Sequence, residues 1–361
     1  MSMKRRFLPH AITLLLLPLA ACNPTQRPED IAVAKVATAP VRVVWGQDAS
    51  EVSDPLMKNG TSRIMAYDST DGRGERVLVP GPAWVNKPLF SPDGNTVIYT
   101  DRKEEKIYKI PFDGSSEPTF YADGYALEVW QQPNGPVWVV IGSKFVDGKY
   151  SFTSKRITRH RLDDPQVSQR MWTSDPVHAD NFQLSRDGGM ATSLFPWPKA
   201  GRLIVDGTEQ HSWQRFGRGC WTSMSPDDSR VSWVFDGAHK NVEMTDGVSQ
   251  WKVDVHQVPG NGGYEMYHPR WTNHPRFLAI SGPYKAGKGA NQIREGGKAV
   301  ELFVGRLNGK ATEVESWVQI THNDVGDFYP DVWIQGGESA VLDRPQVRTT
   351  AATTTPKTSH H

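Results

Sequence analysis

The chain has 361 residues, with 41 basic and 40 acidic side chains, so its net charge is close to neutral. It contains no basic stripe interleaved with aromatic residues, which excludes the usual pattern of a nucleic-acid-binding protein. Its length, 13 Trp and 13 Phe are sufficient for one large apolar core.

The first 22 residues have the pattern of a secretion signal. Basic Lys4-Arg5-Arg6 precedes an apolar run from Phe7 to Leu19, which is shorter than the roughly 20 residues that a transmembrane helix needs. The next tetrapeptide, Leu-Ala-Ala-Cys22, resembles the lipobox of bacterial lipoproteins. This resemblance implies cleavage after residue 21, lipidation of Cys22 and anchoring in a membrane of the cell envelope. The alternative is an ordinary signal peptide cut at the same place.

The sequence also predicts the limits of the folded domain, residues 41–343. Residues 22–40 are polar, contain Pro and lack a strand pattern, so we expect a flexible tether after the lipidated cysteine. By the lipoprotein resemblance, Asn23 in place of Asp favours the outer over the inner membrane. Residues 344–361 are rich in Thr and are predicted to be disordered. Once Cys22 is modified, the chain cannot form an intramolecular disulfide.

Six short extended runs between these limits each end in a polar turn, and a β-rich stretch follows each turn. The turns contain Pro, Asp, Asn or Gly, which accommodate the bend between two antiparallel strands. One residue marks each turn: Asp93, Asn134, Asp187, Asp227, Asn273 and Gln335. The marks are about 40 to 60 residues apart, which is the length of a four-stranded blade with insertions. The sequence therefore predicts an all-β fold, a six-bladed β-propeller.

The two ends of this domain each supply part of a blade. Three β-like segments lie within residues 41–80, before the first turn, and two more, 331–334 and 339–342, accompany the last. Neither set makes a blade alone. We therefore predict that N-terminal and C-terminal strands pair in one blade and close the ring.

Two of the turns carry a family resemblance. Phe90-Ser-Pro-Asp-Gly94 and Met224-Ser-Pro-Asp-Asp228 are each followed by an alternating strand and are similar to the repeats of TolB-like propellers, also called WD40-like or PD40 repeats. The resemblance covers roughly residues 42–343 and implies the propeller fold. It does not imply one activity, because propellers host many functions. Residues 23–40 are also too few for the α/β domain that precedes the TolB propeller.

Side chains at the starts of the innermost strands of a propeller converge at one mouth of the central channel. Here they combine charged, aromatic and imidazole groups, which predicts a site for a polar ligand. The candidates at these starts are Lys87, Glu128, Asp180, Trp221, His268, Arg270 and Asp331. His239, from a dense cluster of unusual residues in blades 4 and 5, is added to them. The alternative is that each side chain only solvates the channel entrance or caps a strand.

Three imidazoles, those of His239, His268 and His274, form a second candidate site together with Arg270. By analogy with calcium- or manganese-dependent propeller lyases that act on uronic acids, they would bind a divalent metal. Their spacing matches no compact metal motif, so we expect no cofactor. Turn formation and hydrogen bonds within a long loop explain these residues without a metal.

The motifs favour binding over catalysis. No Gly-x-Ser-x-Gly nucleophile elbow is present, which argues against a serine peptidase. We expect a monomeric, lipid-anchored envelope propeller that binds a protein or polysaccharide through its funnel and performs no chemistry. The alternative is a metal-assisted lyase or hydrolase of acidic sugars. A third possibility is a structural role through the sides of the blades.

Overall fold

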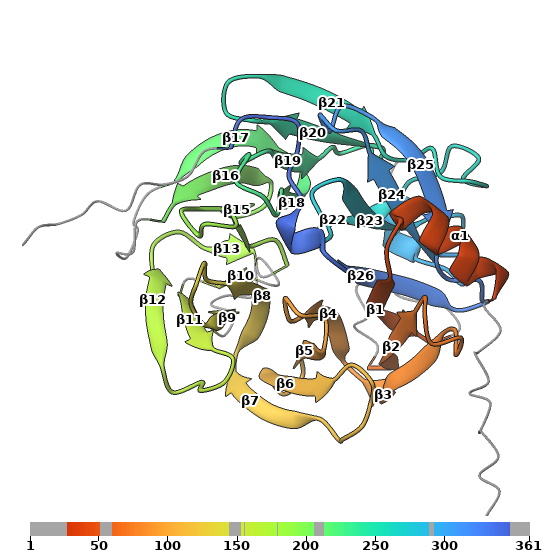
Figure 1. Cartoon of the computed structure of the whole chain (residues 1–361), viewed down its shortest axis with the longest axis horizontal. Coiled ribbons are helices and arrows are strands. Elements are labelled where there is room, and N and C mark those ends of the chain that lie inside the picture. The colour runs from red at the N-terminus through yellow and green to blue at the C-terminus, as the bar shows by residue number, and fades with distance from the viewer. Residues whose placement is uncertain are drawn as a thin grey trace, which may run out of the picture.

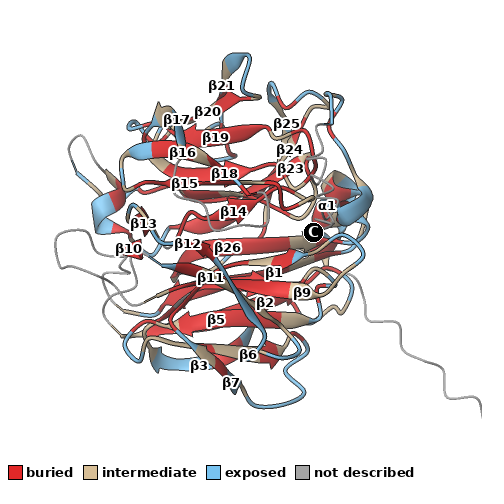
Figure 2. Cartoon of the chain, turned by 90° about the vertical axis from the view of Figure 1, so that its left-hand side faces the viewer, coloured by how far each residue is buried: buried red, intermediate tan, exposed pale blue. Residues whose placement is uncertain are grey.

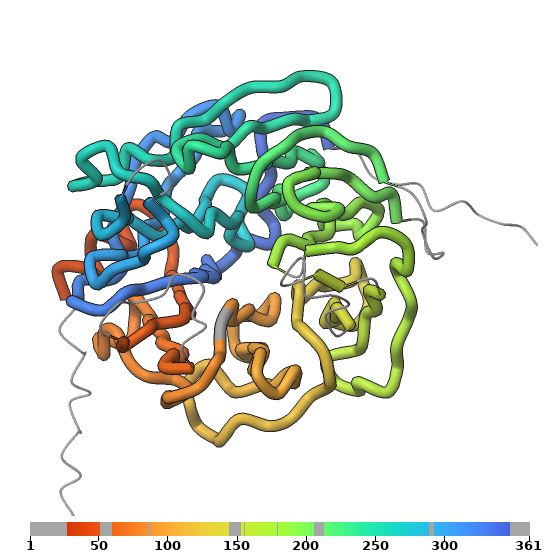
Figure 3. Tube along the Cα trace, turned by 180° about the vertical axis from the view of Figure 1, so that it is seen from behind, coloured from red at the N-terminus to blue at the C-terminus, as the bar shows by residue number. Residues whose placement is uncertain are grey.

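A computed structural model describes residues 27–50, 60–143, 153–154, 156–178, 180–205, 213–288 and 292–346. Six four-stranded antiparallel sheets are arranged around one axis, as Figures 1 and 3 show from opposite sides. The predicted six-bladed β-propeller is thus confirmed. The predicted signal peptide, Cys22 and residues 347–361 lie outside the described residues.

Each blade runs from an innermost strand at the channel to an outermost strand at the rim. Blade 1 contains β4 (Val85–Phe90), β5 (Thr96–Asp101), β6 (Lys106–Pro111) and β7 (Thr119–Asp123). Blade 2 contains β8 (Tyr125–Gln131), β9 (Val137–Gly142), β11 (Ile157–Arg161) and β12 (Ser168–Trp172). Blade 3 contains β14 (Gln183–Leu184), β15 (Met190–Leu194), β16 (Lys199–Ile204) and β17 (Gln214–Arg218).

The remaining blades follow the same plan. Blade 4 contains β18 (Cys220–Met224), β19 (Ser232–Phe235), β20 (Asn241–Thr245) and β21 (Gln250–Asp254). Blade 5 contains β22 (Tyr267–Trp271), β23 (Phe277–Gly282), β24 (Glu301–Leu307) and β25 (Val314–Gln319). Blade 6 contains β26 (Gly326–Ile334), β1 (Val41–Asp48), β2 (Ser62–Asp68) and β3 (Arg76–Ala83). A small extra sheet pairs β10 (Thr153–Ser154) with β13 (Val177–His178).

The predicted polar turns join the innermost strand of blades 1 to 5 to the second strand. In blade 1, the amide of Gly94 donates to the carbonyl of Ser91 (2.8 Å), and Gly94 has a φ of +70°. In blade 3, Gly188 repeats this bond to Ser185 (2.9 Å) with a φ of +71°. Glycine accepts this left-handed conformation at low cost. We call the end of the ring with these turns the hairpin face, and the opposite end the strand-start face.

Blade 6 closes the ring as predicted. The C-terminal strand β26 is innermost and pairs antiparallel with β1, so that Val43 lies opposite Val332 and Gly46 opposite Phe328. This pairing joins strands from the two ends of the chain within one sheet. Every innermost strand therefore belongs to a complete blade.

The predicted strand 339–342 is wrong. After β26 the chain forms the short 3-10 helix η2 (Gly337–Ser339) and then crosses the hairpin face without pairing in a sheet. We call residues 336–346 the C-terminal strap. Its Leu342 amide donates to the carboxylate of Asp227 in blade 4 (2.7 Å), and Arg344 lies over the ring of Trp251. The chain is therefore ordered by contacts beyond residue 343, the predicted end of the domain.

The predicted tether also contains structure. Helix α1 (Pro28–Ala37) begins with Pro28 and carries acidic residues in its first turn, both of which favour a helix N-terminus. The hydroxyl of Tyr67 donates to the buried carboxylate of Asp30 (2.7 Å), and Val33 is buried in the core. These contacts fix the helix against the rim of the ring, so residues 28–37 are not a flexible tether.

The core lies between neighbouring blades. Innermost strands such as β8 and β18 are mostly buried, while outermost strands such as β7, β17 and β21 are mostly half-buried or exposed (Figure 2). Trp233 of blade 4 and Trp271 of blade 5 stack with ring centroids 4.1 Å apart. Among the described residues, no helix has the length and apolar character needed to cross a membrane.

Candidate functional site

The innermost strands are kinked near their starts. Lys87, Trp221, His268 and Tyr329 all have a positive φ, between +41° and +54°, and the pairing register shifts at each of these positions. Pro follows three of the four residues. Pro lacks an N–H group and is therefore tolerated at such bulges. The bulges place the four side chains around a small cavity on the axis.

Aromatic rings close the channel toward the strand-start face. Trp221 packs edge-on against His268 and Tyr329, with ring centroids 5.0 Å and 5.7 Å away, and His268 lies 4.1 Å from Tyr329. The Nδ1 atom of His268 is 2.9 Å from the Ser281 hydroxyl. The cavity beside these rings has a volume of about 20 Å³, which is enough for a single water molecule. The mouth predicted to bind a ligand is therefore a packed plug.

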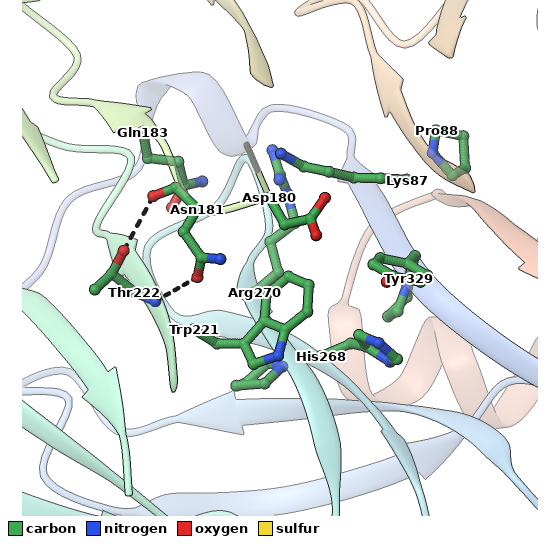
Figure 4. A pocket seen from close by; sticks show the side chains of 12 residues that line it. Lys87, Pro88, Asp180, Asn181, Gln183, Trp221, Thr222, His268, Arg270 and Tyr329 are labelled. Atoms are coloured by element: carbon green, nitrogen blue, oxygen red, sulfur yellow. Dashed lines mark hydrogen bonds between the residues drawn. The ribbon is translucent and has the colours of Figure 1, made fainter. Parts of the chain in front are cut away.

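Charged groups lie beside this plug, as Figure 4 shows for Lys87, Asp180 and Arg270. Asp180 forms a buried ion pair with Arg102, and Lys87 Nζ donates to the carbonyl of Leu127 (2.8 Å). Burial lowers the pKa of Lys87 to about 7, and the charge of Arg270 acts in the same direction. The ammonium group of Lys87 is therefore only partly protonated near neutral pH.

A funnel opens on the hairpin face instead. It has a volume of about 690 Å³, within the range of small-molecule sites. Arg270 and Gln183 border both the funnel and the small cavity, so they mark its floor. Aromatic and aliphatic side chains alternate with amides and carboxylates on its wall: Phe90, Val129, Trp130, Trp333, Gln131, Asn134, Asn273, Asp187 and Glu338.

Two predicted ligand-binding residues connect neighbouring blades at this floor. Asp331 Oδ2 accepts from the Phe90 amide (2.7 Å), while its Oδ1 lies 2.8 Å from Arg270 Nε. Glu128 Oε2 accepts from the Leu184 amide (2.6 Å). An innermost strand is a sheet edge, so its amides need partners outside their own ladder. Both carboxylates supply such a partner to the next blade.

The same connection recurs with uncharged side chains. Gln183 accepts from the Met224 amide (3.0 Å), and Ser223 accepts from the Trp271 amide (3.0 Å). At these four junctions the acceptor lies on the neighbouring innermost strand itself. At the other two junctions, Thr100 accepts from the Ala126 amide (3.0 Å) and Asn273 from the Ile334 amide (2.7 Å).

A sequence motif underlies two of these connections. Glu128-Val-Trp130 and Asp331-Val-Trp333 occupy matching positions in blades 2 and 6. Trp130 Nε1 donates to the carbonyl of Ser185 (3.1 Å) and Trp333 Nε1 to that of Pro92 (2.8 Å), each in the turn of the following blade. The acid-Val-Trp repeat was the signal in the sequence for this role, and the sequence analysis missed it.

Comparisons with known proteins agree with this architecture. No protein-family model matches the chain, and no curated protein matches it. Among solved structures, TolB from Acinetobacter baumannii is similar with a TM-score of 0.52 at 12% identity, over 82% of this chain and 67% of that chain. The fold is that of the TolB propeller. A chain of a nidogen/laminin complex is similar with a TM-score of 0.51 at 11% identity, over 81% of this chain and 98% of that chain. At such low identity, these likenesses show the fold alone.

The TolB-like propeller brings most of the predicted site residues together, but not all. Lys87, Asp180, Trp221, His268 and Arg270 line the small cavity. Glu128, Arg270 and Asp331 line the funnel. His239 lies apart from both and is paired with Glu265, since its Nδ1 is 3.2 Å from Glu265 Oε2.

The three imidazoles of the alternative metal site do not meet. Tyr267 lies between His239 and His268, with ring centroids 5.4 Å and 4.5 Å from them. His274 belongs to the turn at the far end of β22, where it packs against Phe277. Among the residues that the model describes, no three His, Cys, Asp or Glu side chains are grouped as metal ligands. The structure therefore gives His239, His268 and His274 no shared site.

Proposed function

We propose that this TolB-like propeller is a lipid-anchored protein of the bacterial envelope, which binds a protein or polysaccharide partner in the funnel of its hairpin face and performs no chemistry. The observation that carries the proposal is the asymmetry of the channel. One end is a plug with space for about one water molecule, whereas the other is a funnel of about 690 Å³. Only the second can admit part of a partner.

The chemistry of the funnel floor supports binding over catalysis. Asp331 and Glu128 each hold a backbone amide of the next blade, so moving either side chain during a reaction would disturb the contact between blades. The lyase or hydrolase alternative relied on three imidazoles that lie apart, and we do not propose it.

The binding proposal is tested by capture from crosslinked cells. Gln131 is exposed on the funnel wall, so Gln131→Trp would narrow the funnel without changing the core. Val248 is 96% exposed in the β20–β21 hairpin, so Val248→Trp adds the same group elsewhere. We expect the tagged wild-type chain and Val248→Trp to capture the same partner and Gln131→Trp to lose it. Equal capture by all three chains would contradict the proposal.

The anchor is tested separately. The lipobox resemblance supports attachment through Cys22. We expect cells fed an alkyne-bearing palmitate to label the wild-type chain and not Cys22→Ser, which should leave the membrane fraction. Equal labelling of the two chains would refute the anchor while leaving the funnel proposal intact.

A further inference from the structure

Arg270 at the funnel floor has an open guanidinium fork. Its Nε lies 2.8 Å from Asp331 Oδ1, and the side chain remains 17% exposed where funnel and small cavity meet. No described residue forms a hydrogen bond with Nη1 or Nη2. The two terminal nitrogens of a guanidinium can bind the two oxygens of a carboxylate in parallel.

The charges around Arg270 favour a ligand with one negative charge. The negative charge of Asp331 offsets the positive charge of Arg270, and the negative charge of Asp180 offsets that of Arg102. Burial raises the pKa of Glu128 to about 8, although Arg270 acts in the opposite direction, so the neutral acid predominates at pH 7 and has a proton to donate. A partly protonated Lys87 lies nearby. A doubly charged phosphate would meet the carboxylate of Asp331, whereas a single carboxylate fits this balance better.

The rest of the funnel wall suits a small ligand that carries hydroxyl groups. Gln131 and Asn134 present amides, and the half-buried ring of Trp333 presents apolar surface. Amides bind hydroxyl groups, and a sugar ring offers hydroxyls together with an apolar C–H face. A folded protein partner needs about 800 Å² of interface, and only a chain end or narrow loop of it would reach Arg270. The depth of the carboxylate site therefore favours a saccharide.

We propose that the funnel binds an acidic saccharide, with its carboxylate held by the two terminal nitrogens of Arg270. This inference rests on the proposed binding function and adds the chemical class of the ligand. The carboxylate accepts two parallel hydrogen bonds from the guanidinium. The sugar hydroxyls bind the amides of the wall.

The test compares tri-galacturonic acid with its methyl ester, which removes the charge and retains the sugar. Binding to the purified full chain is measured by calorimetry. We expect the acid to bind the wild-type chain roughly 10 to 100 times more tightly than the ester, the range for charge-assisted hydrogen bonds. In Arg270→Gln this preference should vanish, while Arg270→Lys, which keeps the charge without the fork, should retain a small part of it.

Arg276→Gln is the matched control. Arg276 belongs to the same blade but pairs with Glu315 (3.1 Å), away from the funnel, so its variant should bind as the wild type does. Because Arg270→Gln removes an ion pair, its thermal unfolding is recorded. If it does not fold, Gln131→Trp replaces it and should abolish binding of the acid.

The following outcomes would refute the proposed binding of an acidic saccharide. Equal affinity for acid and ester, an unchanged preference in Arg270→Gln, or no binding of either sugar would each refute the acidic saccharide. Arg270-dependent binding of an oligoglutamate peptide without binding of the sugar would assign the site to a protein. The crosslinking capture by wild type and Gln131→Trp judges the proposed function independently of all these results.

Discussion

Glu128 and Asp331 each serve two purposes at the channel. One oxygen of each carboxylate holds an amide of the next blade, and both side chains also line the funnel. The burial of Glu128 destabilises its charged form, because a charged carboxylate loses hydration when buried, and this raises the pKa of Glu128. The stability of the ring therefore depends on pH through Glu128.

The first prediction concerns Glu128→Gln. Burial raises the pKa of Glu128 to about 8, whereas an unfolded glutamate has a pKa of about 4.3. The folded chain thus retains a proton between these values, so this contribution to stability is present below about pH 4 and is lost as pH rises through 8. Glutamine remains neutral and can still accept from the Leu184 amide. From pH 5 to pH 9, the free energy of unfolding of Glu128→Gln should rise by on the order of 4 kcal/mol relative to that of the wild type.

Urea unfolding at several pH values measures this difference. Glu243→Gln, at a half-exposed position in blade 4, is the control and should show no such gain. Lys87, whose pKa is lowered to about 7, contributes with the opposite sign in both wild type and variant, so comparing the two chains isolates Glu128. A constant difference across this pH range would contradict the prediction.

The second prediction separates two costs of replacing a turn glycine: the cost of a positive φ and the cost of a clash with a Trp ring. A Cβ atom on Gly94 would lie 2.5 Å from the Trp333 ring, and Gly94 has a φ of +70°. Gly260 has a similar φ, +75°, with open space around it, and Gly237 has neither constraint. Alanine at Gly260 should cost about 1 kcal/mol for its conformation. Alanine at Gly94 should cost about 1 to 3 kcal/mol more, because the ring must move.

Free energies of unfolding of the three alanine variants test this order. Gly237→Ala should lie within about 0.5 kcal/mol of wild type. If Gly94→Ala were no worse than Gly260→Ala, the Trp333 ring would not constrain the turn.

At the scale of the strands and helices, the repeated turns were the sequence feature that predicted most of the fold. Turns such as 91–94 contain residues that favour a bend wherever they occur, so their spacing predicted both the hairpins and the number of blades. Helix α1 was missed although Pro28, Glu29 and Asp30 are ordinary signals of a helix start. Its stability depends on Tyr67 and the rim of the ring, contacts that lie far away in the chain.

The third prediction concerns ring closure by β1 and β26. Deleting residues 41–80 removes three strands of blade 6 and leaves β26 without its partner. We expect the whole domain to unfold, since an open ring exposes apolar surface on two blades and two free sheet edges. Deleting residues 27–40 removes only α1 and keeps the β1–β26 pairing, so that variant should remain folded with a lower melting temperature. Circular dichroism and limited proteolysis distinguish the two states; a folded 41–80 deletion would contradict closure by pairing.

For the whole molecule, the sequence predicted which side chains approach the axis, but not which mouth is open. Inner-strand position alone placed Lys87, Trp221 and His268 at the channel, as the structure does. The plug depends on positive φ values at the bulges and on aromatic contacts between blades that are distant in sequence. His239 was assigned to the funnel by its neighbours in sequence, whereas the fold pairs it with Glu265.

Site-specific photo-crosslinking in living cells tests the binding funnel most directly. A photoreactive amino acid replaces Gln131, which is exposed on the funnel wall, or Val248, which lies in an outer hairpin. We predict a discrete crosslinked product from position 131 and none from position 248. Products from both positions, or from position 248 alone, would contradict a partner bound in the funnel.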